Sequence, residues 1–233
     1  MLDELREFFR YTNQETKEIF ISIIFMAFIF SFLPLSLGFG NVLFVLTSSL
    51  IITGISFFIH VSLQKAISVL RGYVATYKYW LIGLLFSLIT AFVSMGTLPL
   101  VLPGVIEIDI VERLRLGKFP YGINYGELAF ISLAGPMSNI FIAFLLKPLY
   151  IITNSSLFKY AIIINLLIAV FTLLPLPHNT GLNIFMNSRL LFYVSFFTVL
   201  LYSVLIWYGN IWALFGAFSL SVIVSFFIYS KTK

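Results

Sequence analysis

The chain has 233 residues, of which 61% are hydrophobic and only 10% charged, and its mean hydropathy is +1.06. Because so few polar residues cannot coat a soluble globule of this length, the composition excludes an ordinary soluble domain and predicts a protein surrounded by lipid. The net charge of +5 comes from basic residues scattered between apolar blocks, so we expect contacts with lipid headgroups and no nucleic-acid partner.

Apolar blocks follow one another along most of the chain. Residues 1–17 mix both charge signs with aromatic residues, which is typical of a segment lying at the membrane surface. The blocks that follow are long enough to cross about 30 Å of hydrocarbon as helices. They predict spans at 18–37, 42–64, 79–101, 127–152 and 159–178, and a last block, 190–229, that is long enough for two helices joined near Tyr208 and Asn210. We therefore expect an all-α integral membrane protein with six to seven transmembrane helices.

These blocks also predict the organisation of the chain. An interfacial segment, 1–17, precedes a transmembrane core, 18–189, and a C-terminal helix pair with a short basic tail, 190–233. With these spans, eight Lys and Arg residues lie on the side of the N-terminus and six on the other side. Since cytoplasmic loops carry the excess of Lys and Arg, the count favours a multi-pass protein with a cytoplasmic N-terminus.

One connection departs from the helical pattern. Over residues 105–110 apolar and acidic residues alternate, which is the period-two pattern of a half-buried strand. Turn residues and a second apolar stretch, 128–133, follow and predict a small β-hairpin at the membrane surface, at about 103–133. Open backbone groups cannot face lipid, so the hairpin either has a solvated edge without a ligand or accepts an extended peptide.

Polar residues inside the apolar blocks are the candidates for chemistry, because each costs free energy unless it is paired or used. They are His60, Gln64, Asn139, Asn165, Thr172, His178, Asn179 and Thr180. His60 and Gln64 are four residues apart and share one helix face, at the spacing that lets two histidines of a His-Glu-x-x-His motif hold zinc. The simplest interpretation of His60 is a buried imidazole that hydrogen-bonds across helices to Thr180 or Asn165.

Residues 55–80, ISFFIHVSLQKAISVLRGYVATYKYW, resemble the second span of the site-2 protease family of intramembrane zinc metalloproteases. The resemblance continues in order through residues 103–105, which are similar to the family's Pro-Gly-Ala, and through AGPMSN at 134–139, similar to its Ala-Gly-Pro-x-x-Asn helix start. It ends with NLLIAVFTLLPLPHNTG at 165–181, which is similar to the family's Asn-rich and Pro-rich segment with its zinc-binding aspartate. The resemblance covers most of residues 14–190 and implies a site-2-protease-like helical core.

The chain departs from that family at the chemical positions. The family holds zinc with two histidines and one aspartate, and a glutamate activates the bound water. The resemblance places His60 at the first ligand, Val61 at the general base, Gln64 at the second ligand and Thr180 at the aspartate. Valine accepts no proton, so general-base assistance, worth roughly 10² to 10⁴ in rate, is lost. Amide and hydroxyl oxygens are poor zinc ligands, and the chain has no cysteine, so we expect no catalytic residue, no bound metal and no other cofactor.

The sequence thus favours a catalytically inactive homologue of the site-2 proteases, a pseudoenzyme that serves as a structural or regulatory subunit in a membrane complex. Its partners would be lipids and transmembrane segments or other integral membrane proteins. The residues predicted to form a partner or substrate groove are Val105, Ile106, Glu107, Ile108, Asn139 and Asn165. The alternative is a divergent intramembrane zinc metalloprotease with a rearranged site built on His60 and His178. A transporter or channel is disfavoured, because the blocks contain no Asp or Glu apart from Glu18 and Glu127 at their first positions and show no clear inverted repeat.

Overall fold

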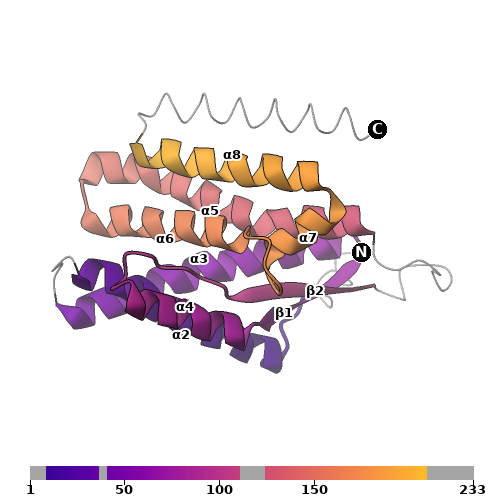
Figure 1. The fold of residues 1–233 in the computed structure, drawn as a ribbon, viewed down its shortest axis with the longest axis horizontal. Coiled ribbons are helices and arrows are strands. Elements are labelled where there is room, and N and C mark those ends of the chain that lie inside the picture. Colours follow the sequence, from indigo (N-terminus) through magenta and orange to yellow (C-terminus); the bar gives the residue numbers. More distant parts are fainter. Residues whose placement is uncertain (1–8, 37–40, 111–123, 209–233) are drawn as a thin grey trace.

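The computed structural model describes residues 9–36, 41–110 and 124–208, which form a bundle of helices beside one small two-stranded sheet (Figure 1). In chain order the elements are α2 (Asn13–Ser36), α3 (Val42–Leu70), β1 (Tyr73–Tyr79), α4 (Leu81–Val93), β2 (Gly104–Ile110), α5 (Tyr125–Thr153), α6 (Ser156–Thr172), α7 (Thr180–Asn187) and α8 (Arg189–Tyr208). Residues 1–8 of the predicted interfacial segment and the second predicted C-terminal helix lie outside the described residues. The division of the chain at residues 17 and 189 stays a prediction.

Three described helices, α3, α5 and α8, are long and apolar enough to cross a membrane. This finding supports the prediction of a membrane protein, but six to seven spans are not supported over the part of the chain that the structure describes. The predicted span at 79–101 is wrong, because helix α4 has 13 residues and is too short to cross about 30 Å of hydrocarbon. The helix ends at Val93 because Met95 and Gly96 follow it with φ angles of 51° and 78°, in the left-handed region.

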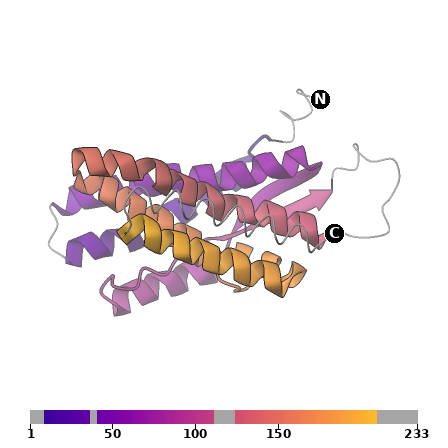
Figure 2. The same cartoon turned by 90° about the horizontal axis from the view of Figure 1, so that it is seen from above.

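The long helices lie side by side in antiparallel succession, as the view from above also shows (Figure 2). Helix α2 packs against α3, α3 against α5, and α5 against α6. Helices α5 and α6 are joined by only two residues, and Asn154 makes this turn in a left-handed conformation with φ 49°. Asparagine tolerates that conformation better than other residues with a side chain, so the sequence is suited to the tight reversal.

Strand β2 confirms the alternation seen in the sequence, since Ile106 and Ile108 are buried and Glu107 and Asp109 are exposed. The predicted hairpin at about 103–133 is wrong in its second strand. Strand β2 pairs with β1 in antiparallel register, with Tyr77 opposite Ile106. The sequence signal for β1 is the YVATYKY run at 73–79, in which every second residue from Tyr73 to Tyr77 is buried.

The stretch predicted as the second strand, 128–133, is helical and belongs to α5. The predicted helix start at 134–139 also lies inside α5. The helix begins earlier, where the side chain of Asn124 accepts a hydrogen bond of 2.9 Å from the Gly126 N–H and Glu127 stands in the first turn. An Asn cap and an early carboxylate both stabilise a helix N-terminus, because they satisfy free N–H groups and oppose the helix dipole.

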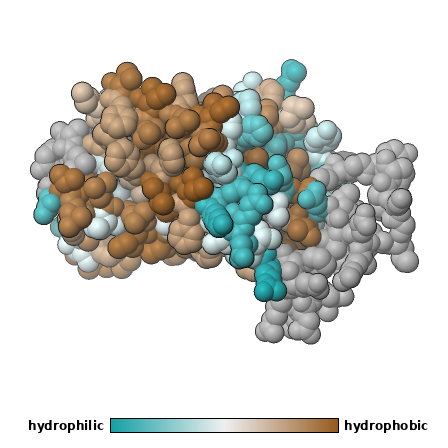
Figure 3. Space-filling model, turned by 90° about the horizontal axis from the view of Figure 1, so that it is seen from below, coloured by the Kyte–Doolittle hydropathy of each residue, from teal (hydrophilic) through white to brown (hydrophobic). Residues whose placement is uncertain are grey.

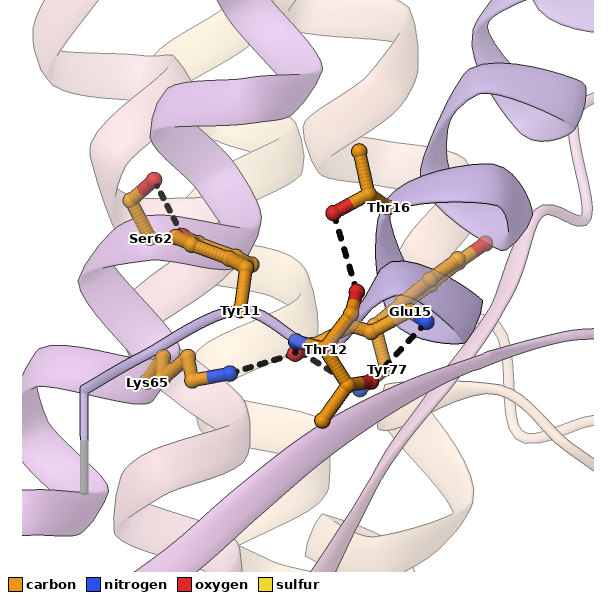
Figure 4. A network of polar contacts seen from close by, with 7 residues as sticks. All are labelled: Tyr11, Thr12, Glu15, Thr16, Ser62, Lys65 and Tyr77. Atoms are coloured by element: carbon orange, nitrogen blue, oxygen red, sulfur yellow. Dashed lines mark hydrogen bonds and ion pairs between the residues drawn. The ribbon is translucent and has the colours of Figure 1, made fainter. Parts of the chain in front are cut away.

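A buried carboxylate joins α2, α3 and β1 (Figure 4). One oxygen of Glu15, Oε2, lies 2.5 Å from Lys65 Nζ, and the other, Oε1, accepts the Tyr77 N–H at 3.1 Å. One turn later, Glu18 Oε2 accepts the Tyr79 N–H at 3.1 Å. The two carboxylates therefore satisfy N–H groups along the outer edge of β1, so α2 closes that edge of the sheet.

Hydrophobic and hydrophilic side chains separate along the long axis of the molecule. Seen from below, apolar side chains cover the surface toward one end, and hydrophilic ones gather in a band toward the other, where the sheet and the start of α2 lie (Figure 3). Large apolar side chains of the long helices are exposed, including Ile51, Phe141 and Phe197. Such a surface is suited to lipid rather than to water.

The buried ion pair yields a stability prediction. Glu15→Gln or Lys65→Met leaves the remaining charge unpaired in the interior, so each should lower the free energy of unfolding by about 3–5 kcal/mol. The double variant should lose less than the sum, since no charge is left unpaired. Denaturant unfolding in detergent measures these effects. Lys78→Met is the control, because the pair of Lys78 with Glu107 is exposed and should contribute at most about 1 kcal/mol.

Candidate functional site

His60 lies buried on α3 and bonds across to α5. Its Nδ1 is 3.2 Å from Asn139 Nδ2, and Ser138 Oγ donates to Asn139 Oδ1 at 3.5 Å. An amide nitrogen only donates, so Nδ1 accepts, and the neutral ring carries its proton on Nε2. The prediction of an interhelical hydrogen bond is confirmed, but the partner is Asn139 and not Thr180 or Asn165.

Gln64, one turn further along α3, also forms a hydrogen bond to α5. Its Nε2 donates to the Ser132 carbonyl oxygen at 3.0 Å, and Asn183 Nδ2 of α7 donates to Ser132 Oγ at 3.1 Å. Ser132 thereby joins three helices. Val61, beside His60, is fully buried in the apolar core with Ile164.

The backbone of α5 lies directly against His60 and Gln64 at Gly135. A Cβ placed on Gly135 would be 2.4 Å from His60 Nε2 and 2.7 Å from Gln64 Nε2, both closer than real Cβ atoms come to other atoms. Only glycine therefore lets the three residues pack as they do. The sequence shows this glycine, but it does not show which side chains occupy the space beside it.

The other predicted site residues bond within their own neighbourhood. Thr180 Oγ1, at the start of α7, donates to the Thr172 carbonyl oxygen at 2.7 Å, and Asn165 Nδ2 donates to the Ala161 carbonyl oxygen at 2.8 Å. His178 lies in the connection between α6 and α7 and is exposed. Its ring is 5.7 Å from that of Trp80, centroid to centroid, at the end of β1. Thus His178 packs on the sheet end, whereas His60 is enclosed between α3 and α5.

The residues at the resemblance-implied ligand positions do not fit zinc. A zinc-bound imidazole offers one nitrogen lone pair to the metal and donates its other N–H to an acceptor, whereas His60 Nδ1 accepts from Asn139. The amide of Gln64 and the hydroxyl of Thr180 donate to backbone carbonyls. Among the residues described, no three His, Cys, Asp or Glu side chains form a group that could hold a metal ion.

The strand residues of the predicted groove lie at the second edge of the sheet. In β1 the N–H groups of Tyr77 and Tyr79 point toward α2, so those of the alternate residues point toward β2. These alternate residues are Val74, Thr76 and Lys78, which lie opposite Asp109, Glu107 and Val105 of β2. The backbone groups of Ile106 and Ile108 therefore point away from β1, and β2 pairs with no other strand in the described part of the chain. Asn139 and Asn165, from the same predicted groove, are instead fully buried in the helical bundle.

Comparison with known proteins points to a metalloprotease-like relationship. A protein of Methanocaldococcus jannaschii named "putative zinc metalloprotease" is 29% identical over 180 residues, which cover 74% of this chain and 84% of that relative. No protein-family model matches the chain, and no solved structure matches it. The matched length includes the greater part of the described residues, so the similarity concerns the helical bundle and not a short motif.

The contact at Gly135 can be tested by adding one methyl group. Gly135→Ala should lower the free energy of unfolding by about 1–3 kcal/mol, because the methyl overlaps His60 and Gln64. Gly54→Ala in α3 is the control, since its Cβ would meet only Ile23 Cγ2 at 3.8 Å, and an added methyl in a helix stabilises by up to about 1 kcal/mol. Thermal unfolding of both variants in detergent should therefore give shifts of opposite sign.

Proposed function

We propose that this chain is a catalytically inactive member of the site-2 protease family that binds transmembrane or extended segments of other membrane proteins, as a structural or regulatory subunit. The observation that carries the proposal is the hydrogen bonding at the former chemical positions. His60 bonds to Asn139, Gln64 to Ser132 and Thr180 to Thr172, while Val61 fills the core. All four side chains thus serve packing and helix contacts.

Zinc hydrolysis needs a metal that polarises the scissile carbonyl and a base that takes a proton from water. Val61 supplies no base, and a neutral amide and an un-ionised hydroxyl at the ligand positions are poor ligands for zinc, which prefers imidazole, thiolate and carboxylate. The amide nitrogen of Gln64 and the hydroxyl of Thr180 already donate to buried carbonyl oxygens, so turning either group toward a metal would cost that hydrogen bond. The proposal therefore assigns no catalytic residue and no cofactor.

In this proposal, a partner segment binds at the edge of β2 that faces away from β1. The N–H and C=O groups of Ile106 and Ile108 point outward there, and an added strand would pair with them. The edge of β1 is closed by Glu15 and Glu18, so a segment would add on one side only. The exposed carboxylates of Glu107 and Asp109 would lie beside its side chains and favour a segment that places no acidic residue there.

The arrangement also supports a cytoplasmic N-terminus. The start of α2, the end of α3, the sheet and the start of α8 lie toward one end of the bundle (Figure 1). The Lys and Arg residues of the described part at that end are Arg10, Lys17, Lys65, Arg71, Lys78 and Arg189, against Lys147 and Lys159 toward the other. The predicted spans place Arg189 on the outer side and Lys147 and Lys159 on the side of the N-terminus, so all three change sides in this arrangement. The excess of positive charge at the sheet end favours the cytoplasm.

Photo-crosslinking tests the binding role. A photoreactive amino acid replacing Glu107 on β2 should capture a partner membrane protein in native membranes, because this side chain lies exposed beside the open edge. The same residue at Lys17, exposed on α2, is the matched control, since α2 covers the closed edge. Equal capture at both positions, or recovery of the wild-type chain as a lone monomer after gentle solubilisation, would contradict the proposal.

The name of the M. jannaschii relative favours a second candidate, a divergent zinc metalloprotease that uses His60 and His178. The positions of the two imidazole rings argue against this candidate. The ring of His60 is buried and bonded to Asn139, whereas the ring of His178 is exposed and packs on Trp80. Two histidines with hydroxyl or amide groups also make a poor zinc cage.

Metal analysis separates the two candidates. We expect the purified wild-type chain to carry no stoichiometric zinc and to leave membrane-embedded peptides intact after zinc is added. About one zinc per chain that is lost in the His60→Ala/His178→Ala variant, together with cleavage that stops on chelation, would instead establish the protease. A His178→Ala variant alone is the control, because its exposed ring should not affect folding.

A further inference from the structure

Two buried oxygens on facing helices have no hydrogen-bond partner in the chain. They are Thr53 Oγ1 on α3 and Asn165 Oδ1 on α6. Both residues are fully buried. Over the described residues the only other buried side-chain oxygen or nitrogen in this state is Asn179 Oδ1. Because buried polar atoms are nearly always paired with protein or with ordered water, two such atoms in one helix contact need a physical account.

Thr53 differs from most of the serine and threonine residues of its helix. Serine and threonine hydroxyls in a helix usually donate to a carbonyl one turn back. Five residues of α3 do so: Thr47, Ser48, Ser49, Ser62 and Ser68. Thr53 makes no such bond, so its hydroxyl is available to a group outside its own helix.

Asn165 is held so that its oxygen is the free atom. Its Nδ2 donates to the Ala161 carbonyl oxygen at 2.8 Å, one turn back on α6. Turning the amide over would place Oδ1 against that carbonyl, where two acceptors repel. Asn165 therefore presents an acceptor that the chain leaves unpaired.

The direction and register of α3 and α6 bring the two residues to similar heights in the bundle. His60 meets Asn139 while Gln64 meets Ser132, so α3 and α5 are antiparallel. Helix α6 reverses again after the tight turn, which makes α3 and α6 parallel. Ser49 Oγ and Tyr160 OH are 2.6 Å apart and fix the register of these two helices.

Thr53 follows Ser49 by four residues, and Asn165 follows Tyr160 by five. At about 1.5 Å per residue, the two residues stand about 6 Å and 7.5 Å beyond Ser49 and Tyr160 on their helices, so this contact places them within roughly one helical turn of each other in height. The residues between α3 and α6 at this level, including Phe57 and Ile164, are buried together in one core cluster.

We propose that Thr53 and Asn165 bind one buried water molecule between α3 and α6. Water donates to Asn165 Oδ1 and both donates to and accepts from a hydroxyl, so it matches the two free groups. A metal ion is excluded as the ligand, because hard cations take about six oxygens and only two neutral ones are offered. The water links α3 to α6 about two turns from His60. It adds to the direct hydrogen bond between Ser49 and Tyr160, which lies one turn away.

A double-mutant cycle with near-isosteric apolar replacements tests the site. Thr53→Val or Asn165→Leu alone leaves the water with one partner, so each should shift the unfolding equilibrium in detergent toward the unfolded state, by roughly 3- to 10-fold. The Thr53→Val/Asn165→Leu variant makes the space apolar, so it should be much less destabilised than the product of the single effects. Thr47→Val, exposed and bonded to its own helix, should change little.

The proposal would be overturned if the effects of the two substitutions on the unfolding equilibrium multiply without coupling, or if either single variant is more stable than the wild type.

A second measurement does not depend on the variants. Radiolytic hydroxyl labelling of the folded wild-type chain oxidises side chains next to bound water. We expect labelling of buried Phe57, one turn from Thr53, above that of Phe30, which is equally buried on α2. Equal labelling of both residues would count against a bound water.

Discussion

The buried ion pair between Glu15 and Lys65 is the interaction on which the rest of this structure depends. Lys65 follows Gln64 directly on α3, so the ion pair attaches α2 beside the buried polar cluster at His60. The second oxygen of the same carboxylate holds β1 through the Tyr77 N–H. Since β2 pairs only with β1 in the described part of the chain, the position of the whole sheet follows from this carboxylate. The two buried charges are tolerated because Lys65 and Glu15 neutralise each other and the Glu15 carboxylate also accepts the Tyr77 N–H.

The same requirement for pairing governs the polar residues deeper in the bundle. His60, Gln64 and Thr180 stand where the resemblance implies zinc ligands, and each is engaged with a neighbouring helix or turn. In a low-dielectric interior such bonds are costly to break, so this polar cluster contributes to helix packing.

The two edges of the sheet differ in their hydrogen bonding, and the proposed binding role depends on this difference. Carboxylates of α2 occupy the edge of β1, and the outward backbone groups of Ile106 and Ile108 are left at β2. Backbone pairing is largely independent of side chains, so such an edge suits segments of different sequence. In the proposed binding role, the exposed carboxylates of Glu107 and Asp109 would add a preference by charge.

By itself the sequence determined the membrane character of the chain, the helical nature of most segments, the alternating faces of residues 105–110 and the shared helix face of His60 and Gln64. These properties follow from composition and local periodicity, which set what each segment can be and which of its sides is buried. Only the tertiary structure decided that 73–79 and not 128–133 pairs with β2, and that Asn139 is the partner of His60. Such choices depend on which remote groups satisfy one another: Glu15 can bind the edge of β1, and Gly135 lets α5 approach His60. Neither relation leaves a periodic signal along the chain.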